Sequence, residues 1–159
     1  MSRISPQFES VLASIRRALA LPDLQPDADG VCQLVFDERF VVNIGWNDPH
    51  VVWFAPVGFV AHEHRGEMLA ALMQGKLFWR ETGGATLSLS QDAGTVVLAY
   101  QTPAHSLTQE DVVALLQWFM QRVDEWIERS DALSRDMAAA PVPAQLTPVF
   151  TGVLPGMRA

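Results

Sequence analysis

Histidine and acidic residues, the side chains that most often bind zinc, gather in one stretch of the sequence. His62-Glu63-His64 lies there, with Asp48 and His50 upstream. Two histidines on a helix bind zinc when they are four residues apart and therefore on one face. Because His62 and His64 are only two residues apart, we expect a solvated loop at this position and no bound metal.

The other reactive side chains do not form a catalytic pattern. Cys32 has no adjacent His or Lys that would lower its pKa, so we expect a buried, unreactive thiol. Lys76 does not lie in a glycine-rich loop after a strand, which argues against nucleotide binding. The carboxylates are scattered through turns and helices, and no pairing among them supports acid/base catalysis. We therefore expect no catalytic residues and no cofactor, and a protein that is not an enzyme.

The composition indicates a folded, acidic chain. Of its 159 residues, 49% are hydrophobic and 18% are charged, which fits one domain with a continuous core and excludes general disorder. A formal net charge of −7 disfavours nucleic acid as a partner, since Lys and Arg must replace its counterions. With one cysteine, no apolar run of about 18 residues and no signal-peptide core, we expect no internal disulfide, no membrane insertion and a cytoplasmic location.

Three segments have the apolar spacing of amphipathic helices. The first begins at Ser5-Pro6, where Ser can cap the helix and Pro suits its first position. The second covers Glu67–Trp79, and the third begins after Thr108 with an acidic first turn and continues past Ser130. Their apolar positions are, in order, Phe8, Val11, Leu12, Ile15 and Leu19; Met68, Leu69, Leu72, Met73 and Leu77; and Val112, Leu115, Leu116, Phe119, Met120, Val123 and Ile127.

Five short runs are rich in β-branched or aromatic residues and bounded by turn residues, which is typical of strands. The first three should form a meander, and the last two a hairpin around the turn Gln91–Gly94. The order α-β-β-β-α-β-β-α predicts an α+β fold, an antiparallel sheet with helices. The predicted strands are Val31–Phe36, Phe40–Ile44, Val51–Val57, Thr86–Ser90 and Thr95–Gln101.

The composition changes after Arg135. Met137–Met157 contains no charged residue, four prolines and two glycines. Proline lacks an amide donor and disfavours helix in the residue before it, so we expect a domain over residues 1–136 and a flexible Pro-containing tail over 137–159. This tail is either a solvated end or, through the apolar residues of Leu146–Leu154, a segment that occupies a groove until another peptide displaces it.

Taken together, these segments resemble a known family. An amphipathic helix over Phe8–Leu21 is followed by Asp29–Asp37 and two further strands, then by a Leu/Met-rich helix and a closing helix with Trp118 and Trp126. This arrangement, with the small size and acidic pI, resembles the class I type III secretion chaperones, the Tir-chaperone family, over residues 5–132.

The resemblance implies a homodimer that binds the N-terminal region of secreted effectors, keeps them competent for secretion and directs them to the export machinery. It places effector binding on the first helix and the sheet, and the dimer contact on the second helix and the neighbouring strand. For the helical residues, packing in the core remains an open alternative. The implied effector-binding residues are Phe8, Leu12, Ile15, Val35, Val42 and Phe54, and the implied dimer-interface residues are Met68, Leu72, Met73 and Leu87.

One departure affects the expected specificity. The uncharged tail is longer than the compact family pattern requires. The chain is also similar in size to broad-specificity export-control members of the HpaB type, which implies several effectors and the secretion ATPase as partners in a bacterial cytoplasm. The alternative function is a non-secretory regulatory or scaffolding module of the same fold that binds a folded protein partner.

Overall fold

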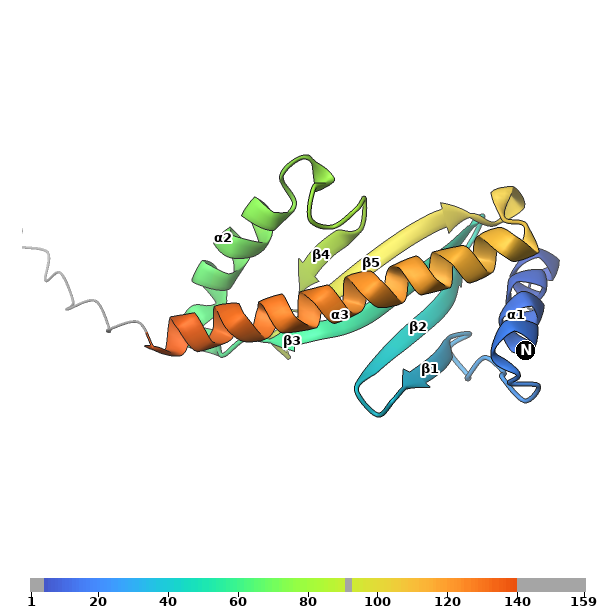
Figure 1. Ribbon diagram of the computed structural model, residues 1–159, viewed down its shortest axis with the longest axis horizontal. Helices are drawn as coiled ribbons and strands as arrows, with labels where there is room; N and C mark the ends of the chain where they lie inside the picture. The colour runs from blue at the N-terminus through green and yellow to red at the C-terminus, as the bar shows by residue number, and fades with distance from the viewer. Residues whose placement is uncertain (1–4, 91–92, 140–159) are drawn as a thin grey trace, which may run out of the picture.

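The computed structural model describes residues 5–90 and 93–139, which form three α-helices and one five-stranded antiparallel sheet (Figure 1). The predicted α+β fold class and element order are confirmed. The turn predicted at Gln91–Gly94 and the tail from residue 140 lie wholly or partly outside the described residues. The elements are α1 (Pro6–Leu19), β1 (Cys32–Phe36), β2 (Phe40–Asn47), β3 (His50–Phe59), α2 (Arg65–Gly75), β4 (Thr86–Leu89), β5 (Thr95–Pro103) and α3 (Gln109–Ala139).

The strands lie in the order β1-β2-β3-β5-β4, so β3 is central and β1 and β4 are the edges. All neighbours pair antiparallel, with one bulge in β3 between Pro56 and Gly58. A tight turn at Asp37 and Glu38, both with positive φ, joins β1 to β2. Hairpin turns of this kind match the twist of the strands that they connect. The predicted meander and second hairpin are therefore both present, although β5 pairs with β3 and leaves β4 outside.

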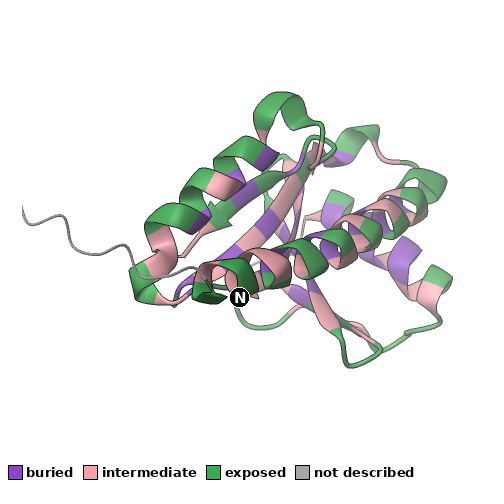
Figure 2. Cartoon of the chain, turned by 60° about the vertical axis from the view of Figure 1, so that its left-hand side comes forward, coloured by how far each residue is buried: buried purple, intermediate pink, exposed green. Residues whose placement is uncertain are grey.

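The helices pack against one side of the sheet, as the position of α3 across β3 and β5 in Figure 1 illustrates. The Phe8 ring of α1 lies 5.9 Å from the Trp46 ring of β2, and Met68 and Leu72 of α2 are part of the same core. In Figure 2 the buried positions alternate along the strands, as expected when only one face of a sheet is covered. The buried hydrophobic residues of the strands are Cys32, Leu34, Val42, Ile44, Val51, Trp53, Ala55, Val57, Leu87, Val96 and Leu98.

Helix α1 begins where the sequence predicts, but not through the expected cap. Ser5 is the N-cap residue and Pro6 the first helical residue. The Ser5 hydroxyl donates a hydrogen bond to Gln7 Oε1 (2.6 Å) and accepts none from the helix amides, which corrects the predicted side-chain cap. The helix ends at Leu19, and the C-cap residue Ala20 has a left-handed conformation and an amide that donates to the Arg16 carbonyl.

Helix α3 has the strong N-terminal cap that its sequence predicts. The Asp111 amide donates to Thr108 Oγ1 (3.2 Å), while the amide and hydroxyl of Thr108 donate to Asp111 Oδ2 (2.8 and 2.6 Å). The hydrogen bond from the Thr108 hydroxyl lowers the pKa of Asp111. The helix continues to Ala139, so residues 137–139 are helical, contrary to the predicted tail boundary. The reason is that Met137 still packs against the core.

Helix α2 is shorter than predicted and ends where it meets α3. It stops at Gly75, and Leu77–Trp79 form a 3₁₀ turn in place of a last helical turn. A Cβ atom on Gly75 would lie 2.6 Å from Cη2 of the buried Trp126. The indole of Trp126 is fixed in turn, because its Nε1 donates to the Glu81 carbonyl (3.2 Å). Glycine at this position therefore allows α2 to lie directly on α3.

The packing of α2 on α3 can be tested with two glycines of the same helix. Gly75→Ala should destabilise the fold by about 1–3 kcal/mol, because the added methyl group overlaps Trp126. Gly66→Ala should be neutral or stabilising by up to about 1 kcal/mol, because its Cβ would meet no atom within 4 Å and alanine favours helix. Urea unfolding followed by circular dichroism measures both. Equal stabilities for the two variants would contradict the close contact.

Candidate binding surfaces

An open groove runs between the end of α1 and the edge strand β1. Residues 20–24 form one wall and residues 33–35 the other, around a volume of about 520 Å³. Leu21 and Val35 are 42% and 62% exposed at this site. Among the described residues β1 pairs only with β2, so the backbone groups on its other side are without a strand partner. Such an edge can accept an added strand.

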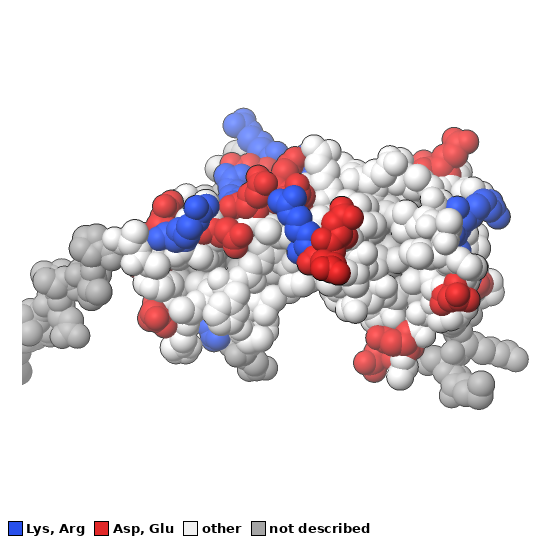
Figure 3. Space-filling model, turned by 60° about the horizontal axis from the view of Figure 1, so that its bottom comes forward, with Lys and Arg blue, Asp and Glu red and all other residues white. Residues whose placement is uncertain are grey.

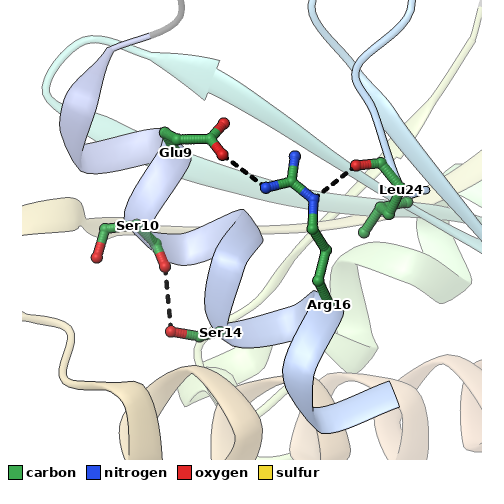
Figure 4. A network of polar contacts seen from close by, with 5 residues as sticks. All are labelled: Glu9, Ser10, Ser14, Arg16 and Leu24. Atoms are coloured by element: carbon green, nitrogen blue, oxygen red, sulfur yellow. Dashed lines mark hydrogen bonds and ion pairs between the residues drawn. The ribbon is translucent and has the colours of Figure 1, made fainter. Parts of the chain in front are cut away.

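A polar network holds the α1 wall of this groove in place (Figure 4). Arg16 Nε donates to the Leu24 carbonyl (2.8 Å), and Arg16 Nη1 forms an ion pair with Glu9 Oε1 (2.6 Å). The Arg16 side chain is largely buried, so it ties residues 21–24 to α1. Side-chain contacts therefore hold this wall of the groove in a defined position.

The start of β1, which forms the other wall, is held by a local turn. Asp27 Oδ1 accepts hydrogen bonds from the amides of Asp29 and Val31, both at 2.9 Å. Through these bonds the carboxylate takes the place of backbone acceptors for the two amides of the turn. The chain therefore enters β1 in a defined direction.

The face of the sheet that points away from the helices is the second candidate surface. Val35 pairs with Val41, and Phe54 pairs with Asn43 on one side and Ala99 on the other. Directly paired residues share a face, and these side chains are half-buried or exposed. A shallow hollow of about 400 Å³ continues this surface towards β4. Its lining residues are Val52, Gly84, Thr86, Ala99, Tyr100 and Gln101.

The structure separates the effector-binding residues implied by the resemblance into two groups. Val35 is exposed beside the groove and Phe54 is half-buried on the open face. Four others are in the core with at most 2% of their surface exposed. Direct contact of these four residues with an effector remains a prediction, and in the described fold they pack in the core that α1 shares with α3 and the sheet. These four residues are Phe8, Leu12, Ile15 and Val42.

The suggested dimer contact divides in the same way. Met68, Leu72 and Leu87 are buried under α2, whereas Met73 is 66% exposed. All four residues remain predicted dimer contacts, and Met73 is the one whose side chain is exposed in the single described chain. Phe78 and Trp79 are also exposed, and the helical spacing of the sequence did not predict this because it extended the helix through both residues. The three consecutive large apolar residues Leu77, Phe78 and Trp79, at the end of the predicted helix, could have indicated this exposed surface.

Met73 belongs to the largest exposed apolar segment in the described chain, here called the α2 patch. Leu69 lies one helical turn before Met73, and the 3₁₀ turn follows the helix directly. Exposed apolar residues that gather in this way mark interaction sites more often than isolated ones do. The α2 patch consists of Leu69, Met73, Leu77, Phe78 and Trp79.

The structure also places the histidines and the cysteine that were considered as metal ligands or nucleophiles. His64 Nδ1 lies 3.6 Å from Glu67 Oε2 in a short 3₁₀ turn, and no three His, Cys, Asp or Glu residues of the described chain are placed to share a metal ion. Cys32 is fully buried, and its burial raises the pKa of the thiol to about 11. None of the described helices is both long and apolar enough to cross a membrane.

The chain is similar in sequence and fold to known proteins. The sequence model of the Tir chaperone protein (CesT) family matches residues 10–127. Among curated proteins, none matches the sequence. A chain of the ExsC–ExsE complex has a TM-score of 0.63 at 22% identity, covering 76% of this chain and 90% of that one.

Two further structures share the fold. One is the Yersinia pestis type III secretion chaperone SycH with a stable fragment of YscM2, with a TM-score of 0.56, 18% identity, and coverage of 74% of this chain and 97% of that one. The other is the HopA1–SchA chaperone–effector complex, with a TM-score of 0.55, 18% identity, and coverage of 77% and 94%. At these identities the likeness establishes the fold.

The burial of Cys32 predicts a dependence of stability on alkaline pH. The pKa of the thiol rises from 9.0 in the unfolded chain to about 11 in the folded one. Between these values only the unfolded state loses the proton, so the free energy of unfolding should fall as the pH rises from 9 to 11. Urea unfolding of the wild type and of Cys32→Val measures the difference, in which other alkaline titrations cancel. A parallel decline in both proteins would contradict the buried, protonated thiol.

Proposed function

The chain belongs to the Tir chaperone protein (CesT) family, and from this premise we propose that it is a type III secretion chaperone. It binds the N-terminal region of secreted effector proteins as a homodimer, keeps that region extended and competent for secretion, and directs the effector to the export machinery. It acts as a binding protein in the bacterial cytoplasm, not as an enzyme. The observation that carries the proposal is the apolar groove beside the free edge of β1.

The groove and the open sheet face suit an extended peptide. Backbone groups of β1 can bond to an added strand without reading its sequence, while Leu21 and Val35 offer apolar contacts to alternate side chains. Phe54 extends the apolar surface beyond the groove. SycH in complex with a YscM2 fragment and the HopA1–SchA chaperone–effector complex support a protein-binding role for this fold.

The α2 patch supports the proposed homodimer. Met73, Phe78 and Trp79 are each about two-thirds exposed or more, an arrangement that a second copy can cover. Buried Met68, together with Leu72 and Leu87, keeps α2 rigid beneath the contact. Two linked grooves would raise the apparent affinity for a long effector segment through effective concentration.

Broad specificity of the HpaB type and contact with the secretion ATPase are finer parts of the proposal. The backbone contacts of an edge strand tolerate many sequences, which supports the binding of several effectors. The flexible methionine at position 73 would similarly adapt to varied apolar partners. The proposed export step requires an ATPase from outside this chain.

Effector binding is tested by placing a charge in the groove. Val35→Asp should weaken the binding of an effector N-terminal segment at least about tenfold, because it buries a carboxylate where an apolar contact of about 1–2 kcal/mol is expected. Ala114→Asp, exposed on α3, is the matched control and should bind like the wild type. Titration calorimetry with a segment of about 50–100 residues measures this, a length suited to wrapping such a surface. If no effector segment binds the wild type, the regulatory-module alternative replaces the chaperone function.

The dimer is tested on the α2 patch. Met73→Asp and Trp79→Asp should each convert the dimer to a monomer, because a carboxylate buried in an apolar interface lacks a partner. Light scattering after size exclusion measures the mass. Val35→Asp, at the other edge of the sheet, is the control and should remain dimeric. A wild type that is monomeric at every concentration would refute the proposed dimer.

A further inference from the structure

We propose that the groove beside β1 selects extended segments whose apolar core has Lys or Arg at both ends. This inference rests on the proposed function and specifies which part of an effector the groove takes. It follows from the distribution of charge around the groove. The apolar walls are bounded by carboxylates at each end of β1.

At the start of β1 the acidic groups come from the loop between α1 and the strand. Asp23 lines the groove itself. Asp27 and Asp29 belong to the turn that leads into β1, and both are exposed. A peptide strand in the groove would therefore pass Asp23 along the wall, and Asp27 and Asp29 where it leaves past the start of β1.

At the other end the acidic groups are in the turn between β1 and β2. Asp37 and Glu38 have φ values of 50° and 54°, and both side chains are exposed. The tight turn keeps them directly after Phe36, the last residue of β1. A peptide strand that leaves the groove at this end passes two further carboxylates.

The cations close to these carboxylates in the chain have other partners. Arg16 is paired with Glu9 and with the Leu24 carbonyl. Arg39, next to Glu38, points to α3, where its Nη2 lies 2.9 Å from Asp124 Oδ1 and 3.4 Å from Glu128 Oε1. Within the described part of the chain, no Lys or Arg is paired with any of the five carboxylates around the groove. These are Asp23, Asp27, Asp29, Asp37 and Glu38.

Figure 3 brings the lower side of Figure 1 forward and shows acidic side chains that stand apart from Lys and Arg, besides others that lie next to basic ones. A net charge of −7 adds to the attraction for a basic segment. Basic residues on the peptide would thus pair with these five carboxylates, here called the rim of the groove, without disturbing existing ion pairs.

The length of β1 sets the spacing of the basic residues. Its five residues span roughly 17 Å at about 3.3 Å per residue. An added strand has the same rise, so its two basic residues should lie about six to eight positions apart. Between them, apolar side chains at alternate positions would face Leu21 and Val35.

The test compares two synthetic peptides with one apolar core, flanked by two Lys residues in one and by two Glu residues in the other. Fluorescence anisotropy at low salt should show about tenfold tighter binding of the Lys peptide, since each exposed ion pair typically changes affinity about two- to fivefold. Added salt should reduce the difference, because screening acts within about 10 Å at 0.1 M ionic strength. Equal affinities would overturn the charge preference and leave the proposed function in place.

Substitutions of the acidic residues test whether the preference for the Lys peptide comes from the rim. Asp23→Asn combined with Asp37→Asn and Glu38→Gln should weaken binding of the Lys peptide about five- to twentyfold and leave the Glu peptide no weaker. Asp131→Asn, exposed on α3, is the matched control and should change neither. Loss of the Lys preference in the control as well would overturn the role of the rim.

The outcomes of these experiments separate this proposal from its alternatives. If effector segments bind in the Val35 experiment but neither short peptide binds, the charged-rim proposal fails alone. If nothing binds in either experiment, the proposed function fails as well. Binding that appears only after deletion of residues 140–159, or only in the monomer variant Met73→Asp, would assign the groove to the chain's own tail or to a second copy.

Discussion

The rest of the structure depends on one constraint, which is that helices cover only one face of a five-stranded sheet. The constraint is met by α3, whose 31 residues span about 46 Å and therefore exceed the roughly 33 Å of the ten-residue strand β3. The excess length lets α3 support α1 near its start, where Gln109 contacts Arg17, and α2 near its middle, where Trp126 meets Gly75. An antiparallel sheet tolerates a free second face.

This arrangement sets the two candidate surfaces apart. The groove is built on β1 at one edge of the sheet, and the α2 patch lies near β4 at the other (Figure 1). In the proposed homodimer the contact through α2 would therefore leave β1 available to an effector. A buried residue of each helix supports the surface beside it. Ile15 anchors α1 beside the groove, and Leu72 anchors α2 beneath the patch.

Electrostatics shape the groove in two ways. The Arg16 network uses a largely buried cation to hold the loop wall, so that cation is not available to a ligand. The acidic groups, by contrast, lie in exposed turns where each keeps contact with water at little cost. The same negative charge favours solubility for a chain that exposes Phe78, Trp79 and Val35. Apolar walls with an acidic rim are thus compatible with a stable, unbound protein.

The sequence by itself determined the fold class, the order of elements and most of the core. Helical spacing and strand alternation report which side chains share a face, and Phe8, Leu12 and Ile15 are gathered as predicted. Only the tertiary structure decided which face is covered. Val42 points to the helices and Val35 away from them, and the left-handed turn at Phe78 and Trp79 exposes both rings. Periodicity carries no information about these choices, because burial depends on which element packs from far along the chain.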